Sequence, residues 1–320
     1  MAEKKHSILV LLGILTDYTD ENHILSSNEL LSLIDKRYNM SLDRKTLYSN
    51  IEILEDMGYE IEHIKGKGFY LKTRQFDKGE MLLLCNAIHA SHFISGDQSD
   101  KLINTLLKTQ SKYERKEFTD KVYLPNPKKI NNKDLMKNIE IISKAISEGK
   151  MLQFTYLEYD YNNKLVPKRE KPYITEPRYI VYAEGKGYLV ATNKNYSDYI
   201  HYRINRIADL IILDEKSEPL KIPSDSYEYA NNRLYMFSGD VESVTFKCHK
   251  KIVDHIVDQV GAGIKVIKIE GDYVFIKIKT SKSGAMFLAQ QYMDTTEIIE
   301  PEHIRNELKE TLKNTIKKYR

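Results

Sequence analysis

The most constraining feature of this chain is the stretch 26–72, in which two short amphipathic helices precede a glycine-rich hairpin. We predict that the first helix begins at Ser27, a candidate N-cap, and that the second covers 41–57 with Ser41 as its N-cap. Apolar residues repeat at helical spacing in each helix and predict one buried face. They are Leu30, Leu31 and Ile34 in the first helix and Leu47, Ile51 and Leu54 in the second. Two short helices joined by the tight connection 37–40 are typical of a helix-turn-helix.

A β-hairpin is predicted directly after the second helix. The segments 59–64 and 69–71 have strand composition, and the Lys-Gly-Lys-Gly turn between them places Lys65 and Lys67 at the tip. An N-terminal amphipathic helix would pack under the second helix. A helix-turn-helix followed by a basic two-stranded hairpin predicts a winged helix over residues 1–76.

The polar side of the second helix is expected to contact DNA. Its first turn presents backbone N–H groups and the positive end of the helix dipole, which suit contact with phosphates. The helix would enter the major groove of a double-stranded DNA operator, and the wing would hold the phosphate backbone. The candidate DNA-contacting residues are Ser27, Arg44, Lys45, Thr46, Tyr48, Ser49, Lys65 and Lys67. The alternative is a three-helix structural subdomain with a hairpin that contacts no DNA.

Net charge gives little support to DNA binding, because the chain is formally only +3. Residues 1–75 hold ten Lys and Arg against twelve Asp and Glu. The DNA hypothesis therefore depends on where the basic residues lie, at the start of the second helix and at the hairpin tip. One head with so few favourable charges would bind weakly, so we expect a homodimer with two heads on adjacent half-sites.

Composition narrows the class of protein. The 320 residues suffice for two or three domains, and the 41% hydrophobic and 30% charged content is typical of soluble proteins. No run of about 18 apolar residues is present, so we expect no membrane span. Cys85 and Cys248 are far apart and make no disulfide framework, which indicates a reducing cytoplasm. No Ser/His/Asp, Cys/His or paired-carboxylate arrangement is evident, so we expect neither an enzyme nor a cofactor.

One predicted helix carries a possible metal motif. Cys85, His89 and His92 lie at i, i+4 and i+7 of the segment 77–95, which would place three ligands on one face. The same spacing fits a helix interface, because cysteine is commonly a small buried residue. We favour the interface and expect no metal site.

Beyond the hairpin the sequence pattern changes three times. Residues 77–148 are predicted to be helical and to form a linker or dimerisation region. Residues 149–222 hold several short alternating strands, which indicate a small antiparallel barrel. Residues 223–320 follow a βαββαβ order with an added helix, which is a ferredoxin-like pattern. The predicted helices of these regions include 77–95, 97–111, 132–147, 227–234, 251–260, 284–291 and 302–319. The predicted fold class is therefore α+β with several domains.

Four motifs resemble a known family. They are Tyr-Ile-Thr-Glu-Pro-Arg at 173–178, Gly-Lys-Gly-Tyr-Leu-Val-Ala at 185–191, His-Tyr-Arg-Ile-Asn-Arg-Ile at 201–207 and Thr-Glu-Ile-Ile-Glu-Pro-Glu-His-Ile-Arg at 296–305. Together with the winged helix before them, they make almost the whole chain similar to the WYL-domain transcriptional regulators. The namesake tryptophan is absent, with Gly187 in its place, and Asn205 stands where an acidic residue is common. These departures bear on ligand preference and leave the fold assignment intact.

The resemblance implies a sensor domain with an Sm-like barrel that binds nucleotides or nucleic acid, followed by a C-terminal extension. The residues suit such an anionic effector, a nucleotide or single-stranded nucleic acid, because arginines bind phosphate in a forked geometry and tyrosines stack on bases. The candidate effector-binding residues are Tyr156, Tyr179, Tyr188, His201, Arg203 and Arg206, with Tyr202 as a further stacking face. The alternative is a barrel core with tyrosines at its rim and solvated arginines.

The two arginines set a condition on the backbone. Strict strand alternation puts Arg203 and Arg206 on opposite faces, so a shared site requires the strand to end or bulge near Asn205. On this hypothesis the chain is a DNA-binding transcriptional regulator, a repressor whose operator affinity responds to the effector. The alternative function is a nucleic-acid-responsive effector or adaptor whose winged helix docks protein rather than DNA.

Overall fold

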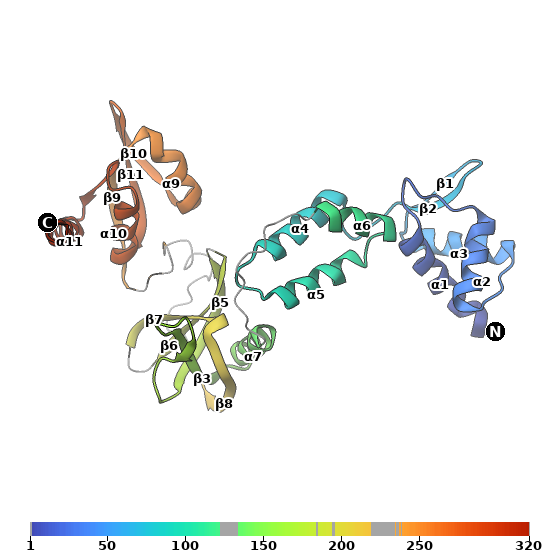
Figure 1. Ribbon diagram of the computed structural model, residues 1–320, viewed down its shortest axis with the longest axis horizontal. Helices are drawn as coiled ribbons and strands as arrows, with labels where there is room; N and C mark the ends of the chain where they lie inside the picture. The colour runs from blue at the N-terminus through green and yellow to red at the C-terminus, as the bar shows by residue number, and fades with distance from the viewer. Residues whose placement is uncertain are drawn as a thin grey trace. The chain divides into compact units, whose positions relative to one another are not determined.

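The computed structural model of the chain describes residues 2–121, 134–183, 185–193, 196–218, 234, 237 and 239–319. The chain divides into two compact units, Met1–Asn131 and Asn132–Arg320. Helices dominate the first unit, whereas antiparallel sheets dominate the second (Figure 1). The predicted α+β fold class is therefore confirmed.

The first unit begins with a winged helix. Its elements are α1 (Ala2–Tyr18), α2 (Ser27–Tyr38), α3 (Arg44–Asp56) and the antiparallel wing strands β1 (Ile61–Ile64) and β2 (Gly68–Leu71). The apolar stripes of the three helices meet in one core, in which Leu11, Leu30 and Leu47 are fully buried. A buried hydrogen bond of 2.9 Å from Asn50 Nδ2 to Ser7 Oγ ties α3 to α1.

The N-caps of α2 and α3 differ from those predicted. Ser26 caps α2, because its hydroxyl accepts the Glu29 N–H at 3.3 Å while the Glu29 carboxylate accepts the Ser26 N–H at 2.8 Å. Asp43 caps α3 by accepting the N–H of the third helical residue at 2.7 Å. The predictions of Ser27 and Ser41 as N-caps were therefore wrong. A capping box needs its acid three residues after the cap, and this spacing selects Ser26.

The wing packs against the segment that precedes α2. Leu25 and Phe69 exchange backbone hydrogen bonds of 3.0 and 2.8 Å. Gly68, with a φ of +135°, lies so close that an added Cβ would come within 2.1 Å of the Leu25 carbonyl oxygen. Only glycine combines this conformation with this approach, so Gly68 holds the wing against the helices.

Three further helices complete the first unit. They are α4 (Lys78–Ala90), α5 (Gly96–Leu107) and α6 (Lys112–Lys121). The first two run side by side as a helical hairpin (Figure 1). Met81, Cys85, Leu107 and Phe118 form the core that α6 shares with this hairpin. The predicted helices 77–95 and 97–111 extended too far, and α6 was not predicted.

The metal motif is broken by the end of α4. That helix stops at Ala90, so His92 lies beyond it, and Cys85 is fully buried with the pKa of its thiol raised by that burial. In the part of the chain that the structure describes, no group of His, Cys, Asp and Glu side chains is arranged to hold a metal ion. Cys85 packs in the interface between the helices instead.

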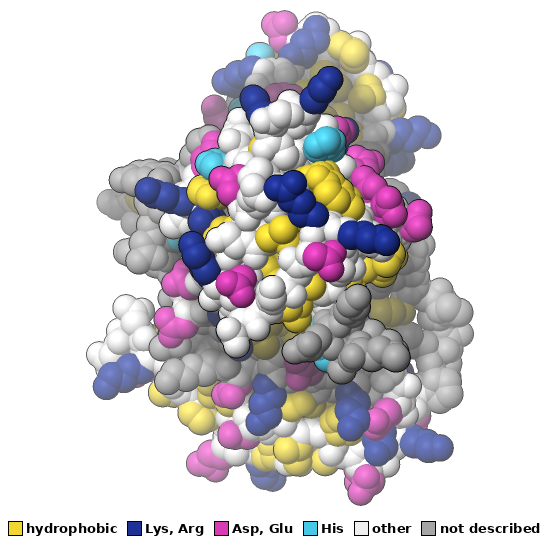
Figure 2. Space-filling view, turned by 90° about the vertical axis from the view of Figure 1, so that its right-hand side faces the viewer, with side chains coloured by type: hydrophobic (Ala, Val, Ile, Leu, Met, Phe, Trp, Pro, Cys, Tyr) yellow, Lys and Arg dark blue, Asp and Glu magenta, His cyan; other side chains and the backbone are white. Residues whose placement is uncertain are grey.

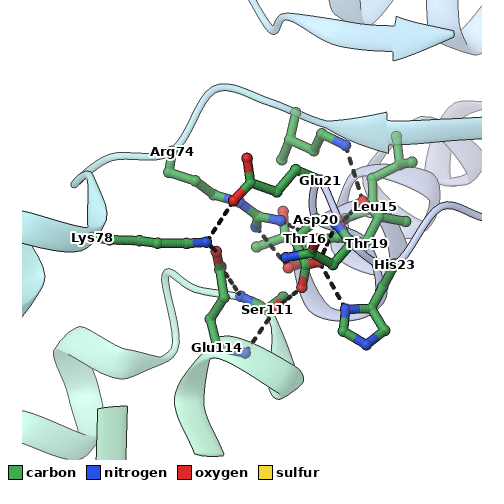
Figure 3. A network of polar contacts seen from close by, with 12 residues as sticks. Leu15, Thr16, Thr19, Asp20, Glu21, His23, Arg74, Lys78, Ser111 and Glu114 are labelled. Carbon is green, nitrogen blue, oxygen red and sulfur yellow. Dashed lines mark hydrogen bonds and ion pairs between the residues drawn. The ribbon is translucent and has the colours of Figure 1, made fainter. Parts of the chain in front are cut away.

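A buried polar network, which we name the α1–α6 joint, ties α6 to the winged helix (Figure 3). Ser111, just before α6, donates a 2.5 Å hydrogen bond to the carboxylate of Asp20, just after α1, and both residues are buried. Arg74, on the chain leaving the wing, donates to the backbone carbonyls of Thr16 and Thr19 at the end of α1. The joint thus connects the end of α1, the exit of the wing and the start of α6.

Ion pairs and a ring contact surround these hydrogen bonds. Lys78 pairs with Glu21 at 2.7 Å and with the buried Glu114 of α6 at 3.5 Å. His23 stacks on Tyr113 of α6 with ring centroids 3.5 Å apart. Because buried polar groups are costly when a partner is lost, this joint should keep α6 and the winged helix together as one body.

The second unit begins with a helix and a curled antiparallel sheet, as predicted for a small barrel. The elements are α7 (Leu135–Glu148), β3 (Lys150–Tyr159), β4 (Leu165–Pro167), β5 (Tyr173–Ala183), β6 (Lys186–Asn193), β7 (Tyr196–Arg203), η1 (Ile204–Arg206) and β8 (Ile207–Lys216). The strand order is β4-β3-β5-β6-β7, and β8 pairs with β3. Fully buried Leu152, Phe154 and Leu189 belong to its core. Asn138 of α7 donates a 2.9 Å hydrogen bond to the carbonyl of Ile207, which fixes the helix to the start of β8.

The C-terminal part of this unit is ferredoxin-like, as predicted. Its elements are β9 (Val241–His249), η3 (Lys250–Ile252), α9 (Val253–Val260), η4 (Gly261–Gly263), β10 (Lys265–Glu270), β11 (Tyr273–Ser281), α10 (Lys282–Gln291), β12 (Thr296–Glu300) and α11 (Glu302–Lys317). The antiparallel order β10-β11-β9-β12 is that of a split βαβ sheet. The predicted helix 227–234 lies outside the described residues, except for Leu234. None of the described helices combines the length and the apolar character needed to cross a membrane.

Candidate nucleic-acid interface and effector site

The N-terminal half of α3 and the start of α2 form one exposed face. Arg44 donates a 2.8 Å hydrogen bond to Asn28 Oδ1, and the hydroxyls of Ser27 and Tyr48 lie 3.1 Å apart. Lys45, one residue after Arg44, is exposed. These two contacts from α2 hold Arg44 and Tyr48 of α3 in place. The sequence did not predict them.

Two other predicted contact residues have different surroundings. Thr46 is half-buried, and its hydroxyl donates to the carboxylate of Asp43 at 3.1 Å, so it takes part in capping α3. Ser49 is exposed one turn after Lys45 on the same side of the helix. The exposed face of the N-terminal half of α3 is therefore made by Arg44, Lys45, Tyr48 and Ser49.

Aromatic contacts link α3 to the wing. The ring of Phe69 in β2 meets the Tyr48 ring edge-on at 5.8 Å and stacks on His63 of β1 at 4.5 Å. Lys65 and Lys67 are exposed at the tip of the same hairpin. Sequence reasoning missed His63; the signal was its place opposite Phe69 in the hairpin register.

Apart from its N-cap Asp43, α3 has its charges placed against the helix dipole. Its first turn holds Arg44 and Lys45 and no acid, whereas Glu55 and Asp56 are in its last turn. Helices are stabilised by acids at the start and cations at the end, so this layout does not serve helix stability. A cationic first turn instead suits an anionic partner that lies against the exposed N-terminal half.

The remainder of the winged-helix surface is mixed in charge. Figure 2 shows Lys and Arg side chains separated from one another by Asp, Glu and uncharged side chains. There is no broad basic patch on this view of the molecule. Electrostatic attraction to DNA would therefore come from a few contacts, as the sequence predicts.

The strand β7, which carries Arg203, ends before Arg206, as a site shared by the two arginines requires. β7 stops at Arg203, and the next three residues form the short helix η1, which includes Asn205 and Arg206. The Arg203 N–H donates to the Tyr156 hydroxyl at 3.1 Å. The Arg206 guanidinium lies over the ring of Tyr159 at 5.5 Å. The structure thus brings both arginines together with two tyrosines of β3.

These arginines form a cationic pair. Burial lowers the pKa of Arg203, and the charge of Arg206 lowers it further. Among the described residues neither guanidinium has an ion-pair partner, and the buried Arg206 Nε has no hydrogen-bond partner. Two guanidiniums that influence each other and lack a carboxylate partner would suit an anionic ligand.

The predicted aromatic residues divide between two groups. Tyr188 lies opposite Arg203 in the register of β6 and β7, and Val190 lies opposite His201. On the neighbouring strand β5, Tyr179 also lies opposite Val190, so it lies on the same face of the sheet as His201. The rings of Tyr156 and Tyr202 instead belong to a cluster with Phe154 and Tyr173. The sequence did not predict Tyr159 as part of the site, because strand alternation alone does not show that it contacts Arg206.

The charged residues of the motif at 173–178 are occupied with one another. Arg178 donates to the carboxylate of Glu176 at 2.7 Å, to the Thr192 hydroxyl at 2.8 Å and to the Glu218 carbonyl at 2.6 Å. The pair Glu176–Arg178 is buried. This motif therefore fixes the chain after β8 to the sheet and leaves no charge free for a ligand.

Comparisons with known proteins bear on the middle of the chain. Residues 137–212 match the model of the WYL domain. No curated protein matches the chain. Proteasome accessory factor B/C (PafBC) of Arthrobacter aurescens has a similar structure, with 13% identity and a TM-score of 0.29 over 95% of this chain and 47% of that chain. This chain thus spans about half the length of that protein. A CRISPR Cas-related protein is similar with 15% identity and a TM-score of 0.40, over 98% of this chain and 84% of that chain.

The matched segment covers most of α7 and most of the barrel, including Arg203 and Arg206. It coincides with three of the four motifs that carry the sequence resemblance. Residues 137–212 therefore form a WYL domain.

Proposed function

We propose that this protein is a DNA-binding transcriptional regulator, a repressor whose operator binding is controlled by an anionic effector at the WYL domain. The DNA-binding part is carried by the common face of α2, α3 and the wing. On that face Asn28 and Ser27 hold Arg44 and Tyr48 in position before DNA arrives. Side chains that are ordered in advance lose less conformational entropy on binding.

On DNA, the N-terminal half of α3 would enter the major groove. Lys45 and Ser49 would face base edges there, while Lys65 and Lys67 at the wing tip would contact phosphates. The acidic last turn of α3 would point away from the backbone. In this orientation the cations in the first turn of α3 lie next to DNA and the acids in its last turn lie away from it.

The effector part rests on Arg203 and Arg206. A ligand with phosphate groups would neutralise both guanidiniums and satisfy the buried Arg206 Nε. Tyr156 and Tyr159 beside them offer aromatic faces to a base. Such a ligand switches the protein only if its affinity differs between the DNA-competent and DNA-incompetent states.

A second function is favoured by the charge of the winged helix, in which acids outnumber bases over residues 1–75. In this alternative the protein is a nucleic-acid-responsive adaptor, and the face of α3 docks a protein partner. The WYL-domain site would keep the same anionic ligand.

Selection of DNA fragments separates the two functions. Purified full-length protein would be mixed with random genomic fragments, and the retained fragments would be sequenced. If the protein is a regulator, we expect a pseudo-palindromic sequence to be enriched. This enrichment should be lost in a Lys45→Ala/Ser49→Ala double variant. Retention of no DNA by the parent protein would favour the adaptor.

Calorimetry tests the effector site separately. The parent protein would be titrated with a panel of nucleotides and short oligonucleotides, beside Arg203→Ala and Arg206→Ala variants. Each substitution should abolish effector binding while operator binding without effector is preserved. Binding that survives both substitutions would place the effector elsewhere.

A further inference from the structure

Asn205 occupies the position between the two arginines of the WYL-domain site. It lies in η1, is 1% exposed, and its Oδ1 accepts a hydrogen bond from Arg203 Nε at 3.3 Å. The backbone turn that brings Arg206 to the site runs through this residue. Asn205 therefore contacts the first guanidinium from within the turn that positions the second.

The amide of Asn205 leaves the charge of the site uncompensated. An aspartate has nearly the same shape and would accept the same hydrogen bond, but it would also supply a negative charge next to the Arg203 guanidinium. The buried carboxylate of Glu176 is already paired with Arg178. In the described structure the site thus keeps two positive charges; burial lowers the pKa of Arg203 most, and the charge of Arg206 lowers it further.

We propose that Asn205 determines the ligand class of this site, which takes a polyanion with at least two linked phosphates in preference to a ligand with one negative charge. The proposal rests on the effector role assigned above to Arg203 and Arg206. Each guanidinium can bind one phosphate in a forked geometry, and a diphosphate or a phosphodiester backbone supplies two of them.

A neutral residue at 205 also leaves the guanidiniums available to the ligand. A charged hydrogen bond is roughly twice as strong as a neutral one, so a carboxylate at 205 would compete with the ligand for Arg203. The Arg206 Nε, buried and without a partner, is a donor that a second phosphate would satisfy. Both effects favour a ligand with more than one phosphate.

The test compares Asn205→Asp with the parent as full-length proteins. Calorimetry would use inorganic pyrophosphate, inorganic phosphate and a thymidine tetranucleotide as probes. Asn104→Asp, at an exposed position of α5, adds the same charge to the other unit and is the matched control. We expect Asn205→Asp to bind pyrophosphate at least about tenfold more weakly, because its carboxylate cancels one of the two positive charges.

Two further readouts separate specificity from a structural role. For the tetranucleotide, the slope of log affinity against log salt should fall by about 0.7 in Asn205→Asp, the value for one phosphate contact on a single strand. Without ligand, Asn205→Asp should have a higher Tm than the parent, because the carboxylate relieves the repulsion between the guanidiniums. Asn104→Asp should change neither quantity.

Each outcome decides the proposal. If the parent binds pyrophosphate and Asn205→Asp binds it equally well with an unchanged preference over phosphate, the proposal is wrong and the effector site remains. If the parent binds none of the three probes, the effector site and the proposal both fail. If Asn205→Asp lowers the Tm and weakens all probes alike, the residue has a structural role only.

Discussion

At the residue scale, substitution of Lys45 should have different effects on the stability of the fold and on DNA binding. It lies in the first turn of α3, where the helix dipole disfavours a cation. Lys45→Ala should therefore leave the free energy of unfolding unchanged or raise it by a few tenths of a kcal/mol, while operator binding weakens by about 1–3 kcal/mol if Lys45 reads a base. Thermal melts and fluorescence anisotropy on the selected operator measure the two effects. Full operator affinity in the variant would show that α3 does not read DNA through this residue.

Lys67 should behave differently, because it lies at the wing tip and contacts phosphate in the proposed complex. Lys67→Ala should weaken operator and unrelated DNA by the same factor and reduce the slope of log affinity against log salt by about 0.9, the value for one phosphate contact on a duplex. Lys101→Ala on α5, exposed and distant in sequence, is the matched control. A loss confined to the operator would instead make Lys67 a base-reading residue.

Asp20 makes the first unit sensitive to acid. Burial raises the pKa of its carboxyl, but hydrogen bonds from Ser111, His23 and the Asn22 N–H outweigh burial and hold that pKa below its ordinary value of 3.8. Because the pKa is lower in the folded state, the carboxylate stabilises the fold above about pH 4, and this contribution is lost as the pH falls further.

Replacement of Asp20 by Asn tests this linkage. The variant should lose about 1–3 kcal/mol of stability at pH 7, since Ser111 and His23 lose a charged acceptor. The difference from the parent should shrink as the pH falls below about 4. Urea unfolding at pH 7 and pH 3 measures it. A difference that is equal at both pH values would mean that ionisation of Asp20 does not stabilise the fold.

At the scale of elements, the sequence predicts long amphipathic segments well. The helix at 132–147 and the βαββαβ order of the C-terminal part agree with the structure because apolar periodicity and turn residues point the same way there. The helix α6 was missed because its sequence is almost entirely polar, with Phe118 as its buried apolar residue. Its position depends on Ser111 and Tyr113 meeting residues about ninety positions earlier, which no local pattern reveals.

The candidate effector site was predicted in part. Arg203 and Arg206 stand out in the sequence. A shared site required the strand to end near Asn205, and the short helix η1 begins there. The grouping of tyrosines could not be predicted, because β5 and β6 contain register shifts that local alternation does not show. Tyr159, at the end of β3, lies under Arg206, which is in the turn between β7 and β8, so this is a tertiary contact.

The α1–α6 joint predicts the size of the stable N-terminal fragment. A fragment of residues 1–121 keeps the hydrogen bond from Ser111 to Asp20, whereas residues 1–76 leave that buried carboxylate without it. The shorter fragment should therefore melt about 5–10 °C lower. Circular dichroism melts of both fragments, with Ser111→Ala in the longer one as the matched variant, measure the effect. Equal Tm values would show that α6 contributes nothing to the winged helix.

At the scale of the whole molecule, we predict a homodimer. Its contacts would come from the helices after the wing and from the C-terminal extension, where apolar side chains are exposed. Leu83 of α4 is 70% exposed, and Met293 and Ile316, which are 55% and 58% exposed, line a groove of about 910 Å³ formed by α10, β12 and α11. Two tethered heads would gain effective concentration on adjacent half-sites about one helical turn of DNA apart.

Sedimentation equilibrium decides the oligomeric state. Full-length protein should be dimeric at micromolar concentration, and a truncation that ends at Leu220 should be monomeric if the extension supplies the interface. A dimeric truncation would assign the interface to the helices of the first unit. A monomeric full-length protein would contradict the dimer.

The scattered charge of the winged helix has a kinetic consequence for a regulator. Proteins move along non-cognate DNA through sequence-independent contacts with phosphates. With Lys and Arg interspersed among Asp and Glu (Figure 2), each visit to such DNA would be brief and each excursion along it short. The protein would reach its operator mostly from free solution, and the genome would sequester little of it. Operator occupancy would then follow the number of free protein molecules closely, so that a small change in the synthesis of the protein changes occupancy without delay.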